Sequence, residues 1–119
     1  MMKTKKQSIG AWGEEEAANY VSSLGYEIIG RNIHTRHGEI DIVAQSGDVI
    51  FFIEVRTLTS SRIAYPEETI TAKKRKSMLA AAEDYAQLHE ILHWQIDAIA
   101  VEGKRTKKPI ITHFENVIG

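Results

Sequence analysis

The chain has 119 residues, 43% hydrophobic and 26% charged, and is predicted to form a single globular domain over residues 1–119. It has no cysteine, which excludes disulfides and thiolate zinc sites and fits a reducing cytoplasm. The formal net charge of −1 argues against a general polyanion binder, and the longest apolar run, residues 49–53, is too short to cross a membrane.

The first predicted element is a helix over residues 8–24, where apolar side chains recur at helical spacing. Ser8 is the expected N-cap and Gly25 the expected stop at the C-terminal end. A strand is predicted over residues 26–33, followed by a turn over residues 34–38.

The next two strands are expected to pair as a hairpin. Residues 39–44 and 49–55 flank Ser46-Gly47-Asp48, and Gly47-Asp48 suits a two-residue turn with glycine first. If Ser46 faces Val49, the numbers of paired residues sum to 95. This register places two acids, one on each strand, directly opposite each other.

Those acids are Asp41 and Glu54, and the same register sets Glu39 opposite Arg56. Because side chains alternate along a strand, all four are expected on one face, with Glu39 pairing with Arg56. Opposed like charges destabilise a sheet pair, and Mg²⁺ is commonly held by one or two carboxylates plus substrate phosphate. The pattern predicts a divalent-cation site; its alternative is a solvated strand face with Arg56 as an ion-pair partner.

The remaining elements follow the same reasoning. A polar loop is expected over residues 57–65, before Pro66. Thr71 is expected to cap a helix that runs to about residue 88. A strand over residues 94–101 and an edge strand over residues 109–114 complete the order α-β-β-β-α-β-β, which predicts a mixed α/β sheet with helices packed on it.

Asp41 followed by Glu54-Val55-Arg56 resembles the Asp…(Asp/Glu)-x-Lys signature of the restriction-endonuclease-like nucleases. A wider set of motifs runs along nearly the whole chain: Gly10-Ala11-Trp12-Gly13-Glu14, Ala17-Ala18, Leu24-Gly25-Tyr26, Arg31-Asn32, Gly38-Glu39-Ile40-Asp41, Phe52-Ile53-Glu54-Val55, Pro66-Glu67-Glu68, Lys73 and Ile96-Asp97. Together they resemble the YraN-like bacterial family, which is grouped with the Holliday-junction-resolvase type of that superfamily.

The resemblance implies a restriction-endonuclease-like αβββαβ core. It implies Mg²⁺- or Mn²⁺-dependent hydrolysis of phosphodiester bonds in DNA, including branched or structured DNA, by a homodimer. It also implies Glu14, Asp41 and Glu54 as metal-site acids. Gly10 has no side chain, which would leave room for the Glu14 carboxylate to reach over the sheet. The alternative for Glu14 is an ordinary charge near the start of a helix.

The chain departs from the family pattern at Arg56, where the family has lysine. An arginine cannot act as a general base, but it can bind the scissile phosphate and stabilise developing charge. Arg56 is therefore counted among the catalytic residues, and Lys73 is expected to reach the site as a substitute for the lysine. A second departure is Gln95, where the family tends to carry arginine.

Basic residues are expected to hold DNA phosphates beside this site. The predicted set is Arg36, Lys73, Lys74 and Lys76, although a solvated face is the alternative. Cations in the first turn of a helix oppose its dipole and so need an anion nearby. Two other functions stay open: a catalytically impaired nucleic-acid-binding module with a degraded site, and a protein-interaction module whose acids are structural.

Overall fold

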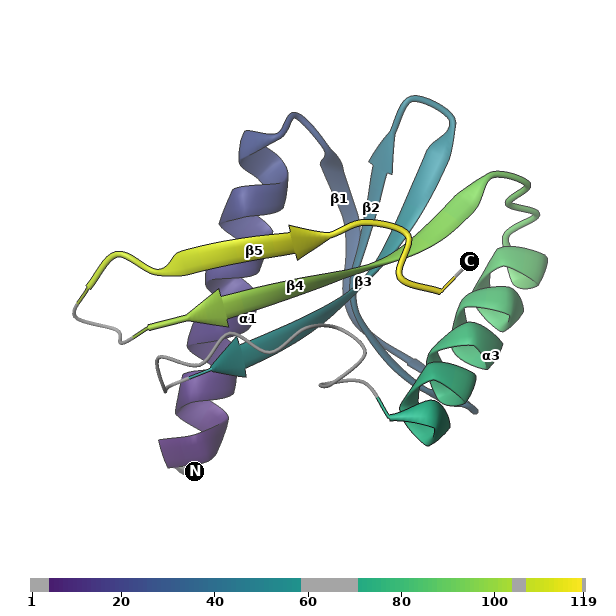
Figure 1. Cartoon of the computed structure of the whole chain (residues 1–119). Coiled ribbons are helices and arrows are strands. Elements are labelled where there is room, and N and C mark those ends of the chain that lie inside the picture. The colour runs from purple at the N-terminus through teal and green to yellow at the C-terminus, as the bar shows by residue number, and fades with distance from the viewer. Residues whose placement is uncertain (1–4, 59–70, 104–106, 119) are drawn as a thin grey trace.

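Five strands form one mixed sheet, with a helix packed on each face (Figure 1). The computed structural model describes residues 5–58, 71–103 and 107–118. The elements are α1 (Lys5–Ser23), β1 (Glu27–Thr35), β2 (Gly38–Ser46), β3 (Val49–Leu58), α3 (Ala72–Leu88), β4 (Trp94–Glu102) and β5 (Ile110–Phe114). Within the described residues, their order confirms the predicted α-β-β-β-α-β-β arrangement and the mixed α/β class, which is compatible with an αβββαβ core.

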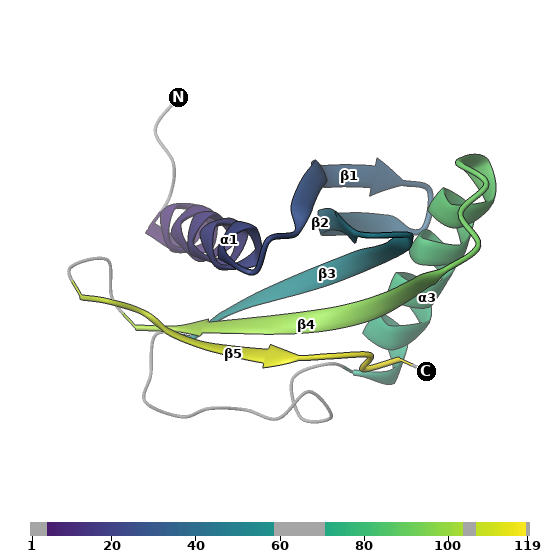
Figure 2. The same ribbon diagram turned by 90° about the horizontal axis from the view of Figure 1, so that it is seen from above.

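The strands lie in the order β1-β2-β3-β4-β5. Neighbouring strands are antiparallel except β3 and β4, which are parallel. A parallel pair needs a crossover connection, and α3 lies in that connection. Figure 2 shows β5 at one edge of the sheet, as predicted for the strand that follows Pro109.

The β2–β3 hairpin has the predicted register. Pairing runs from Ser46 opposite Val49 to Ile42 opposite Ile53, so the paired numbers sum to 95. Gly47 has a φ of 60°, the conformation that its place in the turn requires. Pairing with β2 ends at Ile53, whereas β3 continues beside β4 to its last residue. The two strands therefore part at the position of the two acids.

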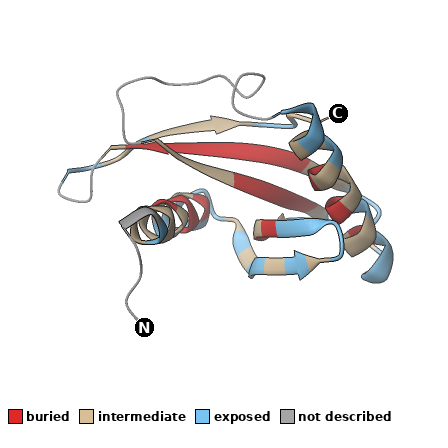
Figure 3. Ribbon diagram, turned by 90° about the horizontal axis from the view of Figure 1, so that it is seen from below, coloured by how far each residue is buried: buried red, intermediate tan, exposed pale blue. Residues whose placement is uncertain are grey.

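The core has two layers, one on each face of the sheet. On one face α3 packs Met78 and three alanines against β2, β3 and β4; on the other α1 packs Ala17, Ala18 and Val21. Figure 3 shows that buried residues concentrate in β3 and β4, while β1 is largely exposed or intermediate. Among the described residues, no helix combines the length and hydrophobicity that a membrane crossing needs.

Several predicted boundaries move. Helix α1 begins at Lys5, so Ser8 lies inside the helix and is not its N-cap. Gly25 has a φ of 87°, as expected just beyond a helix end. Strand β3 includes the first two residues of the predicted loop, and residues 59–65 lie outside the described residues. Thr71 is confirmed as the cap of α3, since its side chain accepts from the Lys74 N–H at 3.1 Å.

Helix α1 approaches β3 most closely at Gly13. A Cβ at this position would overlap Thr57 Oγ1 and lie 3.0 Å from both Thr57 Cβ and Cγ2, so rotation of the threonine would still leave the tight contact with its Cβ. At Gly10 a Cβ meets no atom of the described residues within 4 Å. Glycine is therefore required at position 13, where the helix contacts Thr57. The expectation that Gly10 is needed to make room for a carboxylate is not supported by a close neighbour among the described residues.

We expect Gly13→Ala to lower the free energy of unfolding by about 1–2 kcal/mol, because overpacking outweighs the gain in helix propensity. The matched variant Gly10→Ala should raise it by up to about 1 kcal/mol, since alanine favours a helix and contacts none of the residues that the structure describes. Urea unfolding of both variants checks this, and equal stabilisation by the two would contradict the close approach to Thr57.

Candidate functional site

Asp41 and Glu54 lie where β2 and β3 part. Oδ2 of Asp41 accepts a hydrogen bond from the Val55 N–H at 2.8 Å. The side chain thus links the two strands just beyond the last backbone pair, Ile42 and Ile53. The Asp41 charge also raises the pKa of Glu54, so the two carboxyl groups lie near each other. The two acids thus lie close together where the strands part, as predicted.

Burial makes this pair hard to ionise. Glu54 is 6% exposed. Its burial and the adjacent Asp41 charge raise the pKa of Glu54 to about 7, against the lowering effect of Lys74 and Arg56. Burial also raises the pKa of Asp41, although the Val55 N–H opposes that rise. A buried and a half-buried carboxyl group, each with a raised pKa, form an oxygen donor set that suits a hard divalent cation.

Two cations contact Glu54 from different elements. Nζ of Lys74 on α3 lies 3.5 Å from Oε1 of Glu54, and Nε of Arg56 on β3 lies 3.7 Å from the same oxygen. Within the described part of the chain, that Arg56 nitrogen is buried without a hydrogen bond. Lys73, which was expected to reach the site, is exposed on the first turn of α3; Lys74 reaches it instead.

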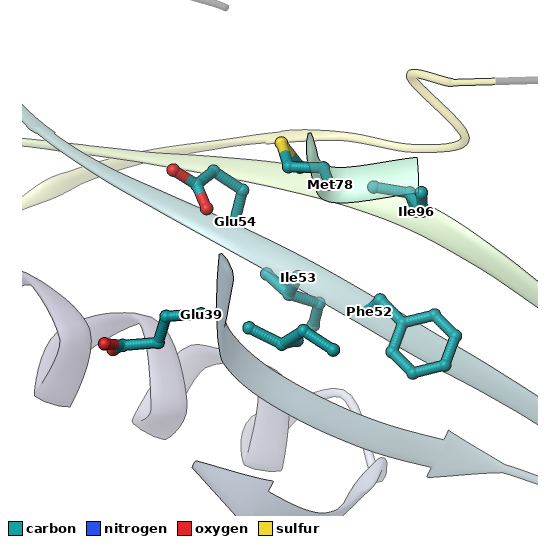
Figure 4. Close-up of a pocket in the computed structure, with 7 residues that line it drawn as sticks. Glu39, Phe52, Ile53, Glu54, Met78 and Ile96 are labelled. Carbon is teal, nitrogen blue, oxygen red and sulfur yellow. The ribbon is translucent and has the colours of Figure 1, made fainter. Parts of the chain in front are cut away.

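A second group of acids extends the site toward α1. One carboxylate oxygen each from Glu14, Glu39 and Asp41 lie within 4.8 Å of one another. Glu14 comes from α1, so the structure brings it to the strand acids as the resemblance implied. In Figure 4 the carboxyl groups of Glu39 and Glu54 both lie on the side away from the Phe52 ring. All four acids thus gather at one end of the sheet.

Asn32 links two of these acids. Oriented with its amide nitrogen toward them, it donates to Oε1 of Glu39 at 2.9 Å and to Oε1 of Glu14 at 2.7 Å. Its φ of 50° places it in the left-handed region within a strand, which asparagine tolerates better than most residues. Sequence reasoning missed Asn32 as a site residue, although Arg31-Asn32 was among the motifs of the resemblance.

The predicted pairing of Glu39 with Arg56 is wrong. In the described structure Glu39 pairs with His34 across β1 and β2, and its Oε2 lies 3.7 Å from Nδ1 of that histidine. The reason is that β2 no longer pairs with β3 beyond Ile42, so the register cannot be extended to position 39. Glu39 joins the acidic group instead of neutralising the arginine.

The predicted phosphate-binding residues do not form one patch. Nη2 of Arg36 lies 3.1 Å from Oδ1 of Asp84, and Arg36 lines an open groove on α3 with Lys76. Asp84 follows Lys74 by ten residues, which is about 15 Å along a helix. The structure therefore brings Lys74 to the acids and places Arg36 beside Asp84, further along α3. Lys76 is close to Lys74 along the helix but is exposed on another side of it.

Another group of potential metal ligands serves as a structural anchor. Oδ1 of the fully buried Asp97 accepts from Gln95 Nε2 and the Asn116 N–H, both at 2.9 Å, and Oδ2 lies 2.7 Å from His113 Nε2. Nδ1 of His113 lies 3.1 Å from the Tyr20 hydroxyl. The group also includes Glu115. These contacts already satisfy the Asp97 carboxylate and tie β5 to β4 and α1.

The chain matches known proteins over most of its length. The model of the uncharacterised protein family UPF0102 matches residues 13–101. A UPF0102 protein of Dehalococcoides mccartyi is 36% identical over 120 residues, with 99% of this chain and 98% of the relative covered. One of Chloroflexus aurantiacus is 39% identical, with 98% and 95% covered, and one of Anaeromyxobacter dehalogenans is 41% identical, with 92% and 82% covered.

Proposed function

The chain belongs to the uncharacterised protein family UPF0102, and we propose that it is a divalent-metal-dependent nuclease domain that hydrolyses phosphodiester bonds in DNA. The observation that carries the proposal is the Asp41–Glu54 pair. A buried carboxyl group, Glu54, lies beside a half-buried one, Asp41, and burial raises the pKa of each. A structural role alone gives no reason to keep such a pair, whereas a Mg²⁺ or Mn²⁺ site does.

The acids fit that cation by their chemistry. Asp41, Glu54 and Glu14 would hold it, with Glu39 beside them, because carboxylate oxygens are the ligands that Mg²⁺ and Mn²⁺ prefer. A bound divalent cation would polarise a phosphoryl oxygen and lower the pKa of the attacking water. Arg56 would stabilise the charge that develops on the phosphoryl group, since a guanidinium keeps its proton at working pH.

The likeness to restriction-endonuclease-like nucleases of the resolvase type belongs to this proposal. Branched DNA is the proposed substrate, and a homodimer would present two such sites to it. Phosphates beyond the one being cleaved would contact Arg36, whose partner Asp84 lies about 15 Å from Lys74 along α3, and Lys76, which points to another side of that helix. Such contacts position DNA without reading its sequence, so binding should weaken steeply as salt rises.

The test is cleavage of supercoiled plasmid and of a synthetic four-way junction by the wild-type protein. We expect cleavage with Mg²⁺ or Mn²⁺ and none with EDTA, because the acids cannot activate water without a cation. Light scattering in the same buffer reports the oligomeric state. Salt-sensitive DNA binding without cleavage in either metal would favour the impaired binding module, and neither binding nor cleavage would favour the protein-interaction module.

A further inference from the structure

Lys74 is held in place by the cap of α3. Thr71 Oγ1 accepts from the backbone N–H of Lys74 at 3.1 Å, which fixes the first turn of the helix. From that turn the Lys74 side chain, 37% exposed, reaches across to β3 and places Nζ 3.5 Å from Oε1 of Glu54. Its neighbour Lys73 belongs to the same turn but is exposed. A difference of one position along the helix therefore separates Lys74, which contacts Glu54, from Lys73, which is exposed.

The position of Lys74 is unfavourable for the helix alone. The N-terminal end of a helix carries the positive end of its dipole, so a cation in the first turn costs about 0.3–1 kcal/mol. Helix α3 has no acidic residue in its first turn to offset that cost. Glu54 offsets it from another element, and the charge of Lys74 also acts on Asp41. The charge of Lys74 is therefore stabilised by the acids of the site and not by residues of its own helix.

Arg56 cannot fill the same place. Its Nε is buried and without a hydrogen bond within the described residues, 3.7 Å from Glu54 Oε1. A guanidinium is a planar, rigid fork, whereas an ammonium is a compact charge with three donors on a flexible stem. The ammonium group at this site therefore comes from Lys74 on α3, because position 56 on β3 carries an arginine.

We propose that Lys74 is a catalytic residue, which supplies from α3 the ammonium that position 56 lacks and contacts the scissile phosphate. This inference rests on the proposed nuclease function. In the reaction the water oxygen bonds to phosphorus and releases a proton to solvent, while the bond from phosphorus to the leaving deoxyribose oxygen breaks and that oxygen takes up a proton from solvent. Lys74 keeps its protons throughout and stabilises the charge on a non-bridging oxygen by a charge-assisted hydrogen bond. Arg56 is then a second cation and not the mark of a degraded site.

The test compares Lys74→Gln with the control variant Lys107→Gln, which removes an equal charge from an exposed lysine outside the proposed site. Single-turnover cleavage of the junction in Mg²⁺ should slow about a hundredfold or more in Lys74→Gln, because a donor to the transition state is lost. Lys107→Gln should stay within about threefold of wild type. Adding Arg56→Lys to Lys74→Gln should restore at least a tenth of the wild-type rate by returning an ammonium to the strand.

Mn²⁺ titration by calorimetry near pH 8 provides a readout that does not depend on turnover. Lys74→Gln should bind Mn²⁺ more tightly than wild type, because the ammonium no longer competes for Glu54 Oε1. Replacing an acid should do the opposite. Slow cleavage with tighter Mn²⁺ binding supports a catalytic ammonium, whereas slow cleavage with weaker Mn²⁺ binding would show that the variant has lost the shape of the site and would overturn the assignment.

The other outcomes separate this inference from the proposed function. If the wild type cleaves and Lys74→Gln cleaves within about threefold of it, only the assignment of Lys74 is wrong. If adding Arg56→Lys to Lys74→Gln restores no activity, the inference that Lys74 supplies the ammonium missing at position 56 is overturned. If the wild type binds Mn²⁺ but cleaves no substrate, the nuclease proposal fails and the catalytic role of Lys74 fails with it.

Discussion

Replacement of Asp41 by asparagine is expected to reduce metal-dependent DNA cleavage by about a thousandfold, the equivalent of several kcal/mol of transition-state stabilisation. Asp41 belongs to both parts of the acidic site. Its charge raises the pKa of the neighbouring Glu54, and one of its carboxylate oxygens lies within 4.8 Å of ligand atoms of Glu14 and Glu39. Loss of its charge should therefore weaken every arrangement in which these acids share a cation.

Asp41→Asn is a mild change for the fold. The asparagine amide oxygen can still accept from the Val55 N–H, and removing this half-buried charge lowers the repulsion within the pair. We expect Mn²⁺ affinity to fall at least about tenfold while the melting temperature without metal stays the same or rises. Single-turnover cleavage, calorimetric titration and thermal unfolding measure the three quantities on one preparation.

The matched control is Asp48→Asn. Asp48 lies at the exposed tip of the same hairpin, so the substitution removes an equal charge away from the acids. It should leave cleavage and Mn²⁺ affinity unchanged. An Asp41→Asn protein that cleaves and binds Mn²⁺ as well as Asp48→Asn would remove Asp41 from the site and with it the basis of the nuclease proposal.

The parts of the fold that follow local rules could be predicted from the sequence. The turn at Gly47-Asp48 fixed the β2–β3 register, and with it the common face of Asp41 and Glu54. The cap at Thr71 gave the start of α3. In each case a few adjacent residues carry the whole signal, so no knowledge of the tertiary structure is needed.

The parts that depend on how elements meet could not be predicted. The pairing of β2 with β3 stops at Ile42 because the strands part, and nothing in the hairpin sequence marks that point. Glu39 consequently lies beside Glu14 and not opposite Arg56. Whether Lys73 or Lys74 reaches the acids depends on the exact start and tilt of α3, since adjacent helical residues point about 100° apart. A periodic pattern in the sequence therefore predicts which face of a helix is buried, but not which single residue makes a given contact.

Replacement of Glu54 by glutamine is expected to stabilise the metal-free protein at alkaline pH by about 3 kcal/mol. The pKa of Glu54 is raised from 4.5 to about 7 by burial and by Asp41. The folded protein thus holds this proton more tightly than the unfolded chain does. The stability that Glu54 contributes is fully present below about pH 4.5 and is lost as the pH rises to about 7, above which the cost is constant. Glutamine mimics the protonated acid and should avoid that loss.

The measurement is the free energy of urea unfolding in EDTA, taken from pH 4 to pH 8.5 for wild type, Glu54→Gln and Glu83→Gln. The difference between Glu54→Gln and wild type should grow between about pH 4.5 and 7, whereas Glu83→Gln, an exposed acid on α3, should follow wild type throughout. Saturating Mg²⁺ should raise the free energy of unfolding of wild type at high pH, because it binds only the folded state. The same Mg²⁺ should raise the free energy of unfolding of Glu54→Gln only slightly. Parallel curves for wild type and Glu54→Gln would mean that the Asp41–Glu54 pair bears no charge that a cation could relieve.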